Sequence, residues 1–215
     1  MGLAHRQAAR RRFMLRHERS LWAEGVTRIA GVDEVGVGPL AGPLVAAAVI
    51  LPTECEVRGI DDSKKLPAAR RQALCAEIEA CAIAIGVGVV DVADVDRLNP
   101  YWASIEAMRR ALAALPVAPQ QVLIDARHIP GLAMPQTALV KGDGRSYSIA
   151  AASIVAKVRR DGMMTALDER FPGYGFGRHM GYGTAEHLAA LARLGPCPAH
   201  RSSFQPVAQD RLPGL

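Results

Sequence analysis

The amino-acid sequence predicts an α/β fold, with a mixed central sheet flanked by helices and followed by a C-terminal helical segment. Half of the 215 residues are hydrophobic, mostly Ala, Val, Leu and Ile, and only 5% are aromatic, a mix that suits helices packed on a sheet. Short apolar runs bounded by glycine and proline alternate with longer helical patterns. The resulting order is strand, strand, helix, strand, helix, strand, strand and then helices.

The first half of the chain contains three predicted strands and one helix. Residues 27–33 (TRIAGVD) and 42–51 (GPLVAAAVIL) are two strands joined by a glycine-rich turn, which predicts an antiparallel hairpin. The second run is apolar throughout, as expected of a strand buried on both faces. A polar loop over 58–67 leads into a helix over about 67–81, with proline at a tolerated first-turn position. Residues 82–92 form the third strand.

In the second half, helix signals are clearer than strand signals. Asn99 and Pro100 are typical of an N-cap and first helical position, and they open the helix YWASIEAMRRALAAL. Residues 120–126 and 136–143 are short strands. A long helix follows from about Ser146 to Pro172, and Thr184 is the N-cap of a short last helix.

The positive charge of the chain is concentrated at its start. The first twenty residues hold six arginines and one glutamate, a charge of +5 that equals the net charge of the whole chain, so residues 21–215 sum to zero. We therefore expect residues 1–24 to be a basic, flexible N-terminal extension, which is also the composition of organellar transit peptides. Residues 25–210 form a single domain, with C-terminal helices from about 184, and 211–215 are a tail. The charge says little about what the domain binds.

Composition also excludes several protein classes. No apolar run reaches the ~18 residues that span a bilayer, so no membrane association is expected. The four cysteines have no C-x-x-C spacing, which argues against a zinc site or a disulfide framework and favours reduced thiols in the cytoplasm. Nothing in the sequence suggests an obligate dimer, and we expect a monomer.

Three of the predicted strands end in acidic residues: VDE, LID and KGD, which contain Asp33, Glu34, Asp125 and Asp143. Ligand sites of α/β proteins form at strand ends. Neighbouring strand residues face opposite sides, so Asp33 and Glu34 reach one site only if the strand ends there. Four clustered carboxylates are tolerable when hard cations such as Mg²⁺ or Mn²⁺ lie between them. Spacing alone leaves open the alternative of three unrelated, solvated strand ends.

Two phosphate-binding motifs can be excluded. GVGPLAG is not a dinucleotide fingerprint, because its third glycine is one residue late and a strand follows where a helix is needed. KGDGRS lacks the G-K-[ST] of a phosphate loop.

Seven segments resemble, in order and spacing, the pattern of bacterial ribonuclease HII: GVDEVGVGPLAGPLVAAAVIL, DDSKKL, VLIDA, LVKGD, SIAAASIVAKVRRD, YGFGRHMGYGT and HRSSFQPV. The similarity covers roughly residues 27–207 and is specific as a combination. It implies a ribonuclease H-like fold, cleavage of the RNA strand of RNA–DNA hybrids, and incision on the 5′ side of single ribonucleotides in duplex DNA. The products carry a 3′-hydroxyl and a 5′-phosphate.

The resemblance also assigns roles to residues. The catalytic, metal-binding set is Asp33, Glu34, Asp125 and Asp143, which would hold two Mn²⁺ or Mg²⁺ ions. The glycine loop, residues 36–38, would lay the backbone amides of Gly36 and Gly38 against a ribose 2′-hydroxyl, and Tyr182 would stack on the next sugar. Further residues would hold backbone phosphates. The substrate-binding set is Gly36, Val37, Gly38, Asp62, Ser63, Lys64, Lys157 and Tyr182.

The chain departs from the family pattern at two cations. The loop usually reads Gly-Arg-Gly but here has Val37, and a usual lysine is replaced by Met180, so phosphate affinity and its salt dependence are expected to be lower. Pro67 replaces a helix-capping serine. Three alternatives remain open: a weakly active enzyme, a non-catalytic hybrid-binding module, and a ribonuclease HIII-like nuclease. His179, His187 and His200 lack metal-ligand spacing and are taken as structural or surface residues.

Overall fold

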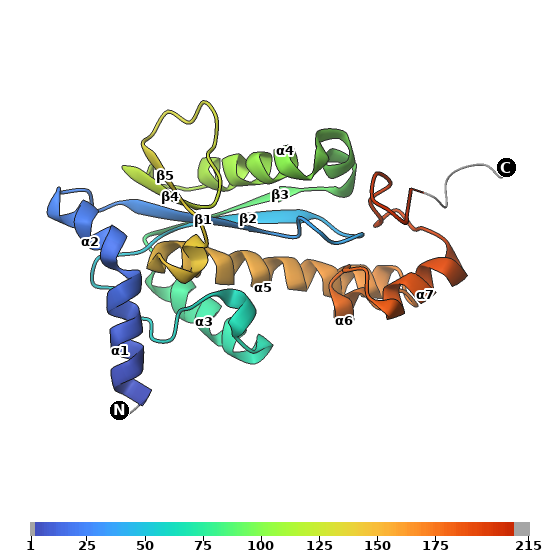
Figure 1. Ribbon diagram of the computed structural model, residues 1–215, viewed down its shortest axis with the longest axis horizontal. Coiled ribbons are helices and arrows are strands. Elements are labelled where there is room, and N and C mark those ends of the chain that lie inside the picture. The colour runs from blue at the N-terminus through green and yellow to red at the C-terminus, as the bar shows by residue number, and fades with distance from the viewer. Residues whose placement is uncertain (1–2, 209–215) are drawn as a thin grey trace.

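The computed structural model describes residues 3–208, and a five-stranded mixed sheet lies at its centre (Figure 1). The strand order is β3 (Ala84–Val90), β2 (Leu44–Ile50), β1 (Ile29–Val35), β4 (Gln121–Asp125) and β5 (Gln136–Leu139). β1 and β3 run antiparallel to β2, whereas β4 runs parallel to both β1 and β5. The predicted α/β class, the hairpin and the mixed sheet are confirmed.

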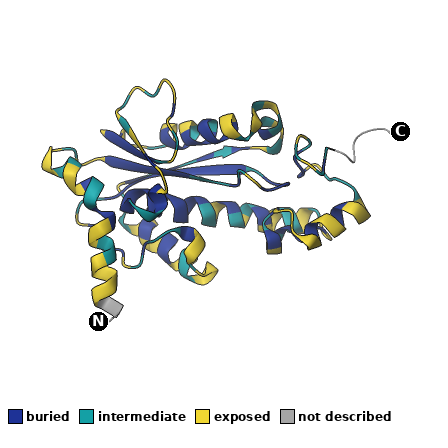
Figure 2. Cartoon of the chain, viewed as in Figure 1, coloured by how far each residue is buried: buried dark blue, intermediate teal, exposed yellow. Residues whose placement is uncertain are grey.

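Helices cover both faces of the sheet. α4 (Val92–Ala113) lies on one face, and α5 (Tyr147–Arg170) and α3 (Ala68–Cys81) lie on the other (Figure 1). Every residue of β2 is buried, with Ala46 and Ala48 packed in the α4 layer and Ala47 and Val49 in the α3–α5 layer (Figure 2). The all-apolar run of the sequence is therefore a strand with core on both sides.

Glycines in the strands let the helices approach the sheet closely. A Cβ added at Gly31 of β1 would lie 2.0 Å from the carbonyl carbon of Ser148 in α5. One added at Gly88 of β3 would lie 2.0 Å from the carbonyl oxygen of Ala107 in α4. Because these contacts are with backbone atoms, no side-chain movement could relieve them.

The α4 region confirms one local prediction and extends it. Asn99 has φ 65° and ψ 163°, and its Oδ1 accepts the backbone N–H groups of Tyr101 and Trp102, as an N-cap does. Two helical turns that the sequence did not indicate precede it, beginning at Val92 and capped by Asp91. The two helical pieces meet at a kink, because Asn99 takes the left-handed φ that asparagine tolerates.

The prediction of a flexible N-terminal extension is wrong for residues 3–23. They form α1 (Leu3–Met14) and α2 (Arg16–Ala23), which lie beside the α3 side of the domain (Figure 1). Met14 and Leu15 are buried in the core. Buried Glu18 accepts hydrogen bonds from the Ser146 hydroxyl at 2.6 Å and the Ser148 N–H at 3.0 Å. The predicted tail, 211–215, lies outside the described residues.

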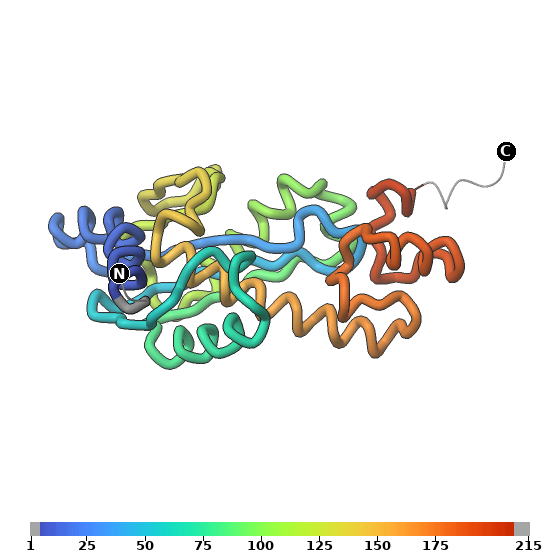
Figure 3. Tube along the Cα trace, turned by 60° about the horizontal axis from the view of Figure 1, so that its bottom comes forward, coloured from blue at the N-terminus to red at the C-terminus, as the bar shows by residue number. Residues whose placement is uncertain are grey.

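The C-terminal helices gather at the far end of α5. α6 (Phe176–His179) and α7 (Ala185–Leu194) lie beside the turn between β1 and β2 (Figures 1 and 3). Thr184 caps α7, so the predicted start of the last helix is confirmed. Two 3₁₀ turns complete the fold, η1 (Ser63–Lys65) and η2 (Gly142–Gly144). None of the described helices combines the length and the apolar character that crossing a bilayer requires.

We predict that Gly31→Ala lowers the free energy of unfolding by about 3 kcal/mol or more, because overpacking here meets backbone and not a movable side chain. The matched control is Gly162→Ala in α5, where an added Cβ meets nothing within 4 Å. That change should be neutral or stabilising by up to about 1 kcal/mol through helix propensity. Urea unfolding measures both; equal stabilities of the two variants would contradict the close packing of β1 on α5.

Candidate active site

Asp33 and Glu34 lie inside β1 and not at its end, contrary to the expectation from sequence. The pairing of β1 with β2 includes both residues and continues to Val35: Glu34 pairs with Ala46, and Val35 pairs with Val45. Strand alternation places Asp33 on the α5 face with Gly31 and Glu34 on the α4 face. The charge of Asp125 nevertheless raises the pKa of both carboxyl groups. Asp33 and Glu34 therefore lie near Asp125, although they point to opposite faces of the sheet.

The parallel pairing of β1 with β4 brings Asp125 to the same level. Val32 pairs with Ile124, so the next residues, Asp33 and Asp125, emerge side by side. Asp125 Oδ1 accepts the N–H of Gly142 at 2.6 Å, which fixes this side chain against the start of η2. The Asp125 carboxylate therefore cannot rotate away from Asp33 without losing its charge-assisted hydrogen bond to Gly142.

Asp143 reaches the group from a turn and not from a strand end. β5 ends at Leu139, and Lys141 takes a left-handed φ of 56° before η2 begins. Asp143 Oδ1 accepts the N–H of Gly144 at 2.8 Å, and the residue is 8% exposed. The third acidic segment thus joins the other two, but through a 3₁₀ turn that the strand pattern did not predict.

Burial and mutual repulsion favour protonated carboxyl groups here. The pKa of Asp33 lies well above its usual range because of burial, followed by the charges of Glu34, Asp125 and Asp143. Burial, then Asp62 and Asp125, raises the pKa of Asp143. Burial also raises the pKa of Glu34, although Arg127 opposes the shift. Such a cluster destabilises the fold unless positive charge enters it.

Two cationic side chains border the carboxylates. Arg127 Nε lies 3.1 Å from Glu34 Oε1, and its guanidinium lies over the Tyr101 ring at 5.1 Å. Lys64 Nζ lies 3.9 Å from Asp143 Oδ2 with a side chain that is 81% exposed. Sequence reasoning missed Arg127; its place two residues after Asp125 was the available signal.

The glycine loop is held from inside by a buried arginine. Arg201 donates from Nη2 to the Gly36 carbonyl at 2.6 Å and from Nη1 to the Val37 carbonyl at 3.0 Å. In a trans peptide the C=O and the following N–H point in opposite directions. The N–H groups of Val37 and Gly38 therefore face away from Arg201, toward the open side of the loop. Arg201 is a further residue that sequence reasoning missed.

A second buried arginine joins this loop to the loop of Tyr182. Arg160 donates to the carbonyls of Pro43 and Ala41 and, at 3.0 Å, to that of Met180. The Leu40 N–H also donates to the Gly181 carbonyl at 2.8 Å. Tyr182 is consequently presented beside the glycine loop, with an exposed ring.

The remaining predicted substrate-binding residues are less available. Asp62 caps η1 by accepting the Lys64 N–H at 2.9 Å. The Ser63 hydroxyl is buried 2.7 Å from the Ser153 hydroxyl. Lys157 Nζ lies 2.6 Å from Asp161 Oδ1. Of these residues, only Lys64 has an exposed side chain beside the carboxylates.

The three histidines are structural, since they are buried and contact one another beneath the Tyr182 loop. The rings of His179 and His187 stack with centroids 4.4 Å apart, and His187 Nε2 lies 3.1 Å from His200 Nε2. Across residues 3–208, no three His, Cys, Asp or Glu side chains are grouped in a way that could hold a metal ion on their own.

The carboxylates still fit a hard divalent cation. Mg²⁺ is usually held by one or two carboxylates together with waters and substrate phosphates, and not by an all-protein cage. Glu34 Oε2 and Ser104 Oγ are buried and, among the described residues, neither meets the geometry of a hydrogen bond, although the Ser104 hydroxyl is close enough to lower the pKa of Glu34. A buried carboxylate oxygen with so little compensation beside repelling carboxylates suits an incoming cation.

Comparison with known proteins identifies the family. The model of the family described as Ribonuclease HII matches residues 30–207. The chain belongs to the ribonuclease HII family. It is 57% identical over 205 residues to the Ribonuclease HII of Geobacillus thermodenitrificans, covering 94% of this chain and 79% of that one. It is also 57% identical over 188 residues to that of Moorella thermoacetica, covering 87% and 91%.

Solved structures confirm the ribonuclease H-like fold. The ribonuclease HII in a complex with PCNA from Archaeoglobus fulgidus superimposes with a TM-score of 0.71 at 27% identity, covering 83% of this chain and 95% of that one. The ribonuclease H2 of Pyrococcus horikoshii OT3 does so with a TM-score of 0.69 at 23% identity, covering 85% and 96%.

We predict that Asp33→Asn raises the free energy of unfolding at pH 7 without divalent cations. The folded-state pKa of Asp33 is raised, so its charge destabilises the native state increasingly as pH rises above the ordinary value of 3.8. The gain should grow as pH rises above this ordinary value, because the unfolded state then ionises Asp33 more readily than the folded state does. It should vanish in acid, where Asp33 is protonated in both states.

Urea unfolding across pH measures this effect, with Glu169→Gln, an exposed position on α5, as the control that removes the same charge outside the site. A variant less stable than the parent protein at pH 7 would contradict the prediction that the charge of Asp33 destabilises the folded state.

Proposed function

We propose that this chain is an endoribonuclease that cleaves the RNA strand of RNA–DNA hybrids and incises on the 5′ side of single ribonucleotides in duplex DNA. The products would carry a 3′-hydroxyl and a 5′-phosphate, and the activity would serve ribonucleotide removal in replication and repair. The main support is the convergence of acidic residues from three separate segments, within a chain of the ribonuclease HII family.

Asp33, Glu34, Asp125 and Asp143 are proposed as the catalytic residues and cation ligands. Two Mg²⁺ or Mn²⁺ ions held by these carboxylates would supply activation of the attacking water and charge stabilisation for the leaving oxygen of the phosphodiester. The hydrogen bond from Gly142 keeps Asp125 oriented, and Arg127 holds one oxygen of Glu34 while leaving the other free. The carboxylates are thus arranged before substrate arrives, which lowers the cost of organising the site.

The glycine loop is proposed to recognise the ribose. With the carbonyls of Gly36 and Val37 turned toward Arg201, the outward N–H groups belong to Val37 and Gly38. These donors suit a 2′-hydroxyl, the group that distinguishes RNA from DNA. The exposed Tyr182 ring beside the loop is placed to stack on the neighbouring sugar.

Phosphate binding is proposed for the 62–64 turn and for Lys157. Lys64 is the exposed cation nearest the carboxylates, whereas Lys157 would have to leave Asp161 to contact a backbone phosphate. Asp62 and Ser63 would act by shaping the turn, through the cap and the buried hydroxyl pair. We place this enzyme in the cytoplasm as a monomer.

The deciding experiment uses duplex DNA with one embedded ribonucleotide, incubated with Mn²⁺ or Mg²⁺ and then with EDTA. We expect a single nick 5′ of the ribonucleotide that EDTA abolishes. Binding without a nick would favour a non-catalytic hybrid-binding module. Preference for uniform hybrids over the single ribonucleotide would favour a ribonuclease HIII-like nuclease.

Asp143→Asn should abolish most turnover, by about 10²-fold or more in kcat, while hybrid binding stays largely intact. The reason is that the amide removes a negative oxygen donor but preserves shape. Asp168→Asn, near the opposite end of α5, is the control. Single-turnover cleavage and fluorescence anisotropy measure the two quantities, and a fully active Asp143→Asn variant would remove this residue from the site.

Val37→Arg should lower KM more than it changes kcat, since a guanidinium in the loop can hold phosphate bidentately. The contact with Arg201 should survive, because it is made by the Val37 carbonyl, while the half-buried Val37 side chain gives up its packing on the core. The control is Val117→Arg, an exposed position outside the site. Steady-state nicking at several salt concentrations measures the effect; an unchanged KM would show that the missing loop cation does not limit binding.

A further inference from the structure

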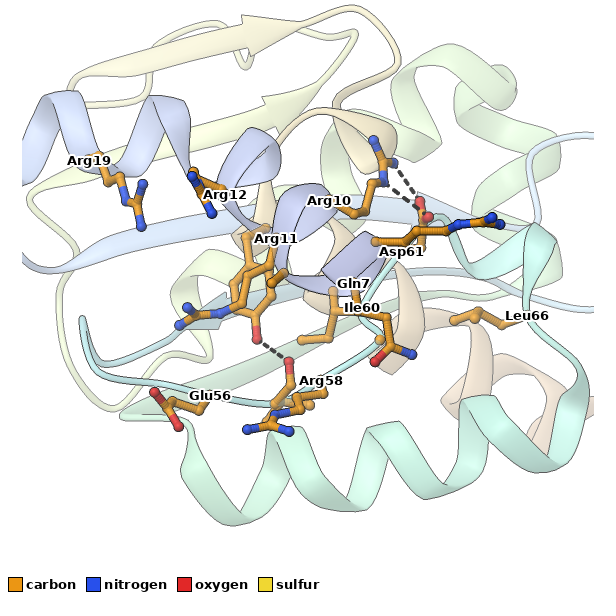
Figure 4. A pocket seen from close by; sticks show the side chains of 15 residues that line it. Gln7, Arg10, Arg11, Arg12, Arg19, Glu56, Arg58, Ile60, Asp61 and Leu66 are labelled. Carbon is orange, nitrogen blue, oxygen red and sulfur yellow. Dashed lines mark hydrogen bonds and ion pairs between the residues drawn. The ribbon is translucent and has the colours of Figure 1, made fainter. Parts of the chain in front are cut away.

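A cavity lined by arginines lies between the N-terminal helices and the loop that follows β2. Its volume is about 730 Å³. Figure 4 shows Arg10, Arg11 and Arg12 on α1 and Arg19 on α2, with Arg58 on the loop that forms the other wall. Arg6 also lines it, and the acidic residues in the lining are Glu56 and Asp61. The six arginines exceed the two acids by four charges.

Two of these arginines have structural partners that hold the wall together. Arg10 forms an ion pair with Asp61 at 2.6 Å (Figure 4). It also donates to the Gly144 carbonyl at 3.0 Å. Arg11 donates to the Cys55 carbonyl at 2.5 Å and lies over the Tyr147 ring at 5.6 Å. These contacts explain why α1 packs against the domain despite its charge.

The other four arginines have no such explanation. Arg6, Arg12, Arg19 and Arg58 are exposed, and within residues 3–208 none of their guanidinium groups has a hydrogen bond, an ion pair or an aromatic partner. Unpaired like charges around one cavity repel each other. A polyanion would relieve this repulsion and be held by several guanidinium groups.

The cavity lies next to the proposed active site. Asp61, in its lining, immediately precedes the turn that presents Lys64. Arg10 joins Asp61 to Gly144, the residue after Asp143. A nucleic-acid strand that passes Lys64 and the carboxylates in this direction therefore reaches the arginines next.

We propose that this cavity binds the sugar–phosphate backbone of the substrate duplex on one side of the cleavage position. The inference rests on the proposed function, since it concerns the same substrate. Guanidinium groups contact phosphates without reading sequence, so the cavity adds affinity and fixes the direction of the duplex. An acidic protein segment is the competing occupant, and the proximity of Lys64 favours nucleic acid.

The test compares two duplexes with EDTA present, so that no cleavage occurs. In one, DNA extends only 5′ of the ribonucleotide, and in the other only 3′. The fourfold variant with Arg6, Arg12, Arg19 and Arg58 changed to Gln should bind one of these duplexes at least tenfold more weakly. For that duplex, the slope of log affinity against log salt should fall by about two to four units, since each phosphate contact contributes about 0.9. The other duplex should bind as before.

The matched control changes four exposed arginines outside the cavity to Gln: Arg28, Arg97, Arg109 and Arg170. It removes the same net charge and should leave both affinities within twofold. A fourfold Arg→Lys variant of the cavity should keep most of the salt slope. If the cavity Gln variant does not fold, Arg12→Gln alone should lower the slope by about one unit.

Equal binding of the parent protein and the cavity variant on both duplexes would overturn the proposal and leave the acidic segment as occupant. Equal loss on both duplexes, or an equal loss in the control variant, would also overturn it, because it would show only an effect of total charge. Nicking by the parent protein is measured separately, so failure of the proposed function is distinguishable from failure of this binding site.

Discussion

The main-chain pairing of β1 with β4 holds two carboxylates together against their repulsion. Backbone hydrogen bonds fix the register in which Val32 faces Ile124, and this register sets Asp33 beside Asp125 whatever their charges prefer. Asp33 is 6% exposed, so water does little to screen the pair. Packing around the site offsets the repulsion between these carboxylates. β2 has core on both sides, and glycines let α4 and α5 pack directly on the backbone of the sheet. A site that is unfavourable on its own is therefore built into the closely packed centre of the fold.

Two buried arginines play the corresponding role for the loops. Burial lowers the pKa of Arg201 to about 10 and also lowers that of Arg160. Their charges are met by backbone carbonyls of the glycine loop, the β1–β2 turn and the loop of Tyr182. Because buried donors without partners are costly, each carbonyl is confined to the orientation that satisfies a guanidinium. The outward direction of the amides at Val37 and Gly38 is a consequence of that confinement.

The sequence predicted those features that depend on local pattern. Apolar runs and caps gave β1, β2, α5 and α7, and the acidic strand ends indicated the segments that meet. Tertiary contacts decided the rest. An arginine-rich segment has no apolar stripe that predicts packing, but Met14 and Leu15 and the buried Glu18 are enough to dock α1 and α2. Likewise, a sequence pattern predicts that arginines such as Arg127 and Arg201 lie on the surface. Only the fold brings Arg127 to Glu34 and Arg201 to the glycine loop.

Positive charge can contribute to substrate affinity from a place where it does not help to position the substrate at the carboxylates. Counterion release depends on how many phosphates are neutralised and not on which residue neutralises them. In the binding mode we propose, arginines on α1, α2 and the 56–61 loop would therefore compensate in affinity for the cations absent at Val37 and Met180. They would not compensate in geometry, because the cavity lies beyond Lys64 and Gly144, away from the glycine loop. Alignment at the proposed cleavage position would then depend on the backbone groups that Arg201 and Arg160 hold in place.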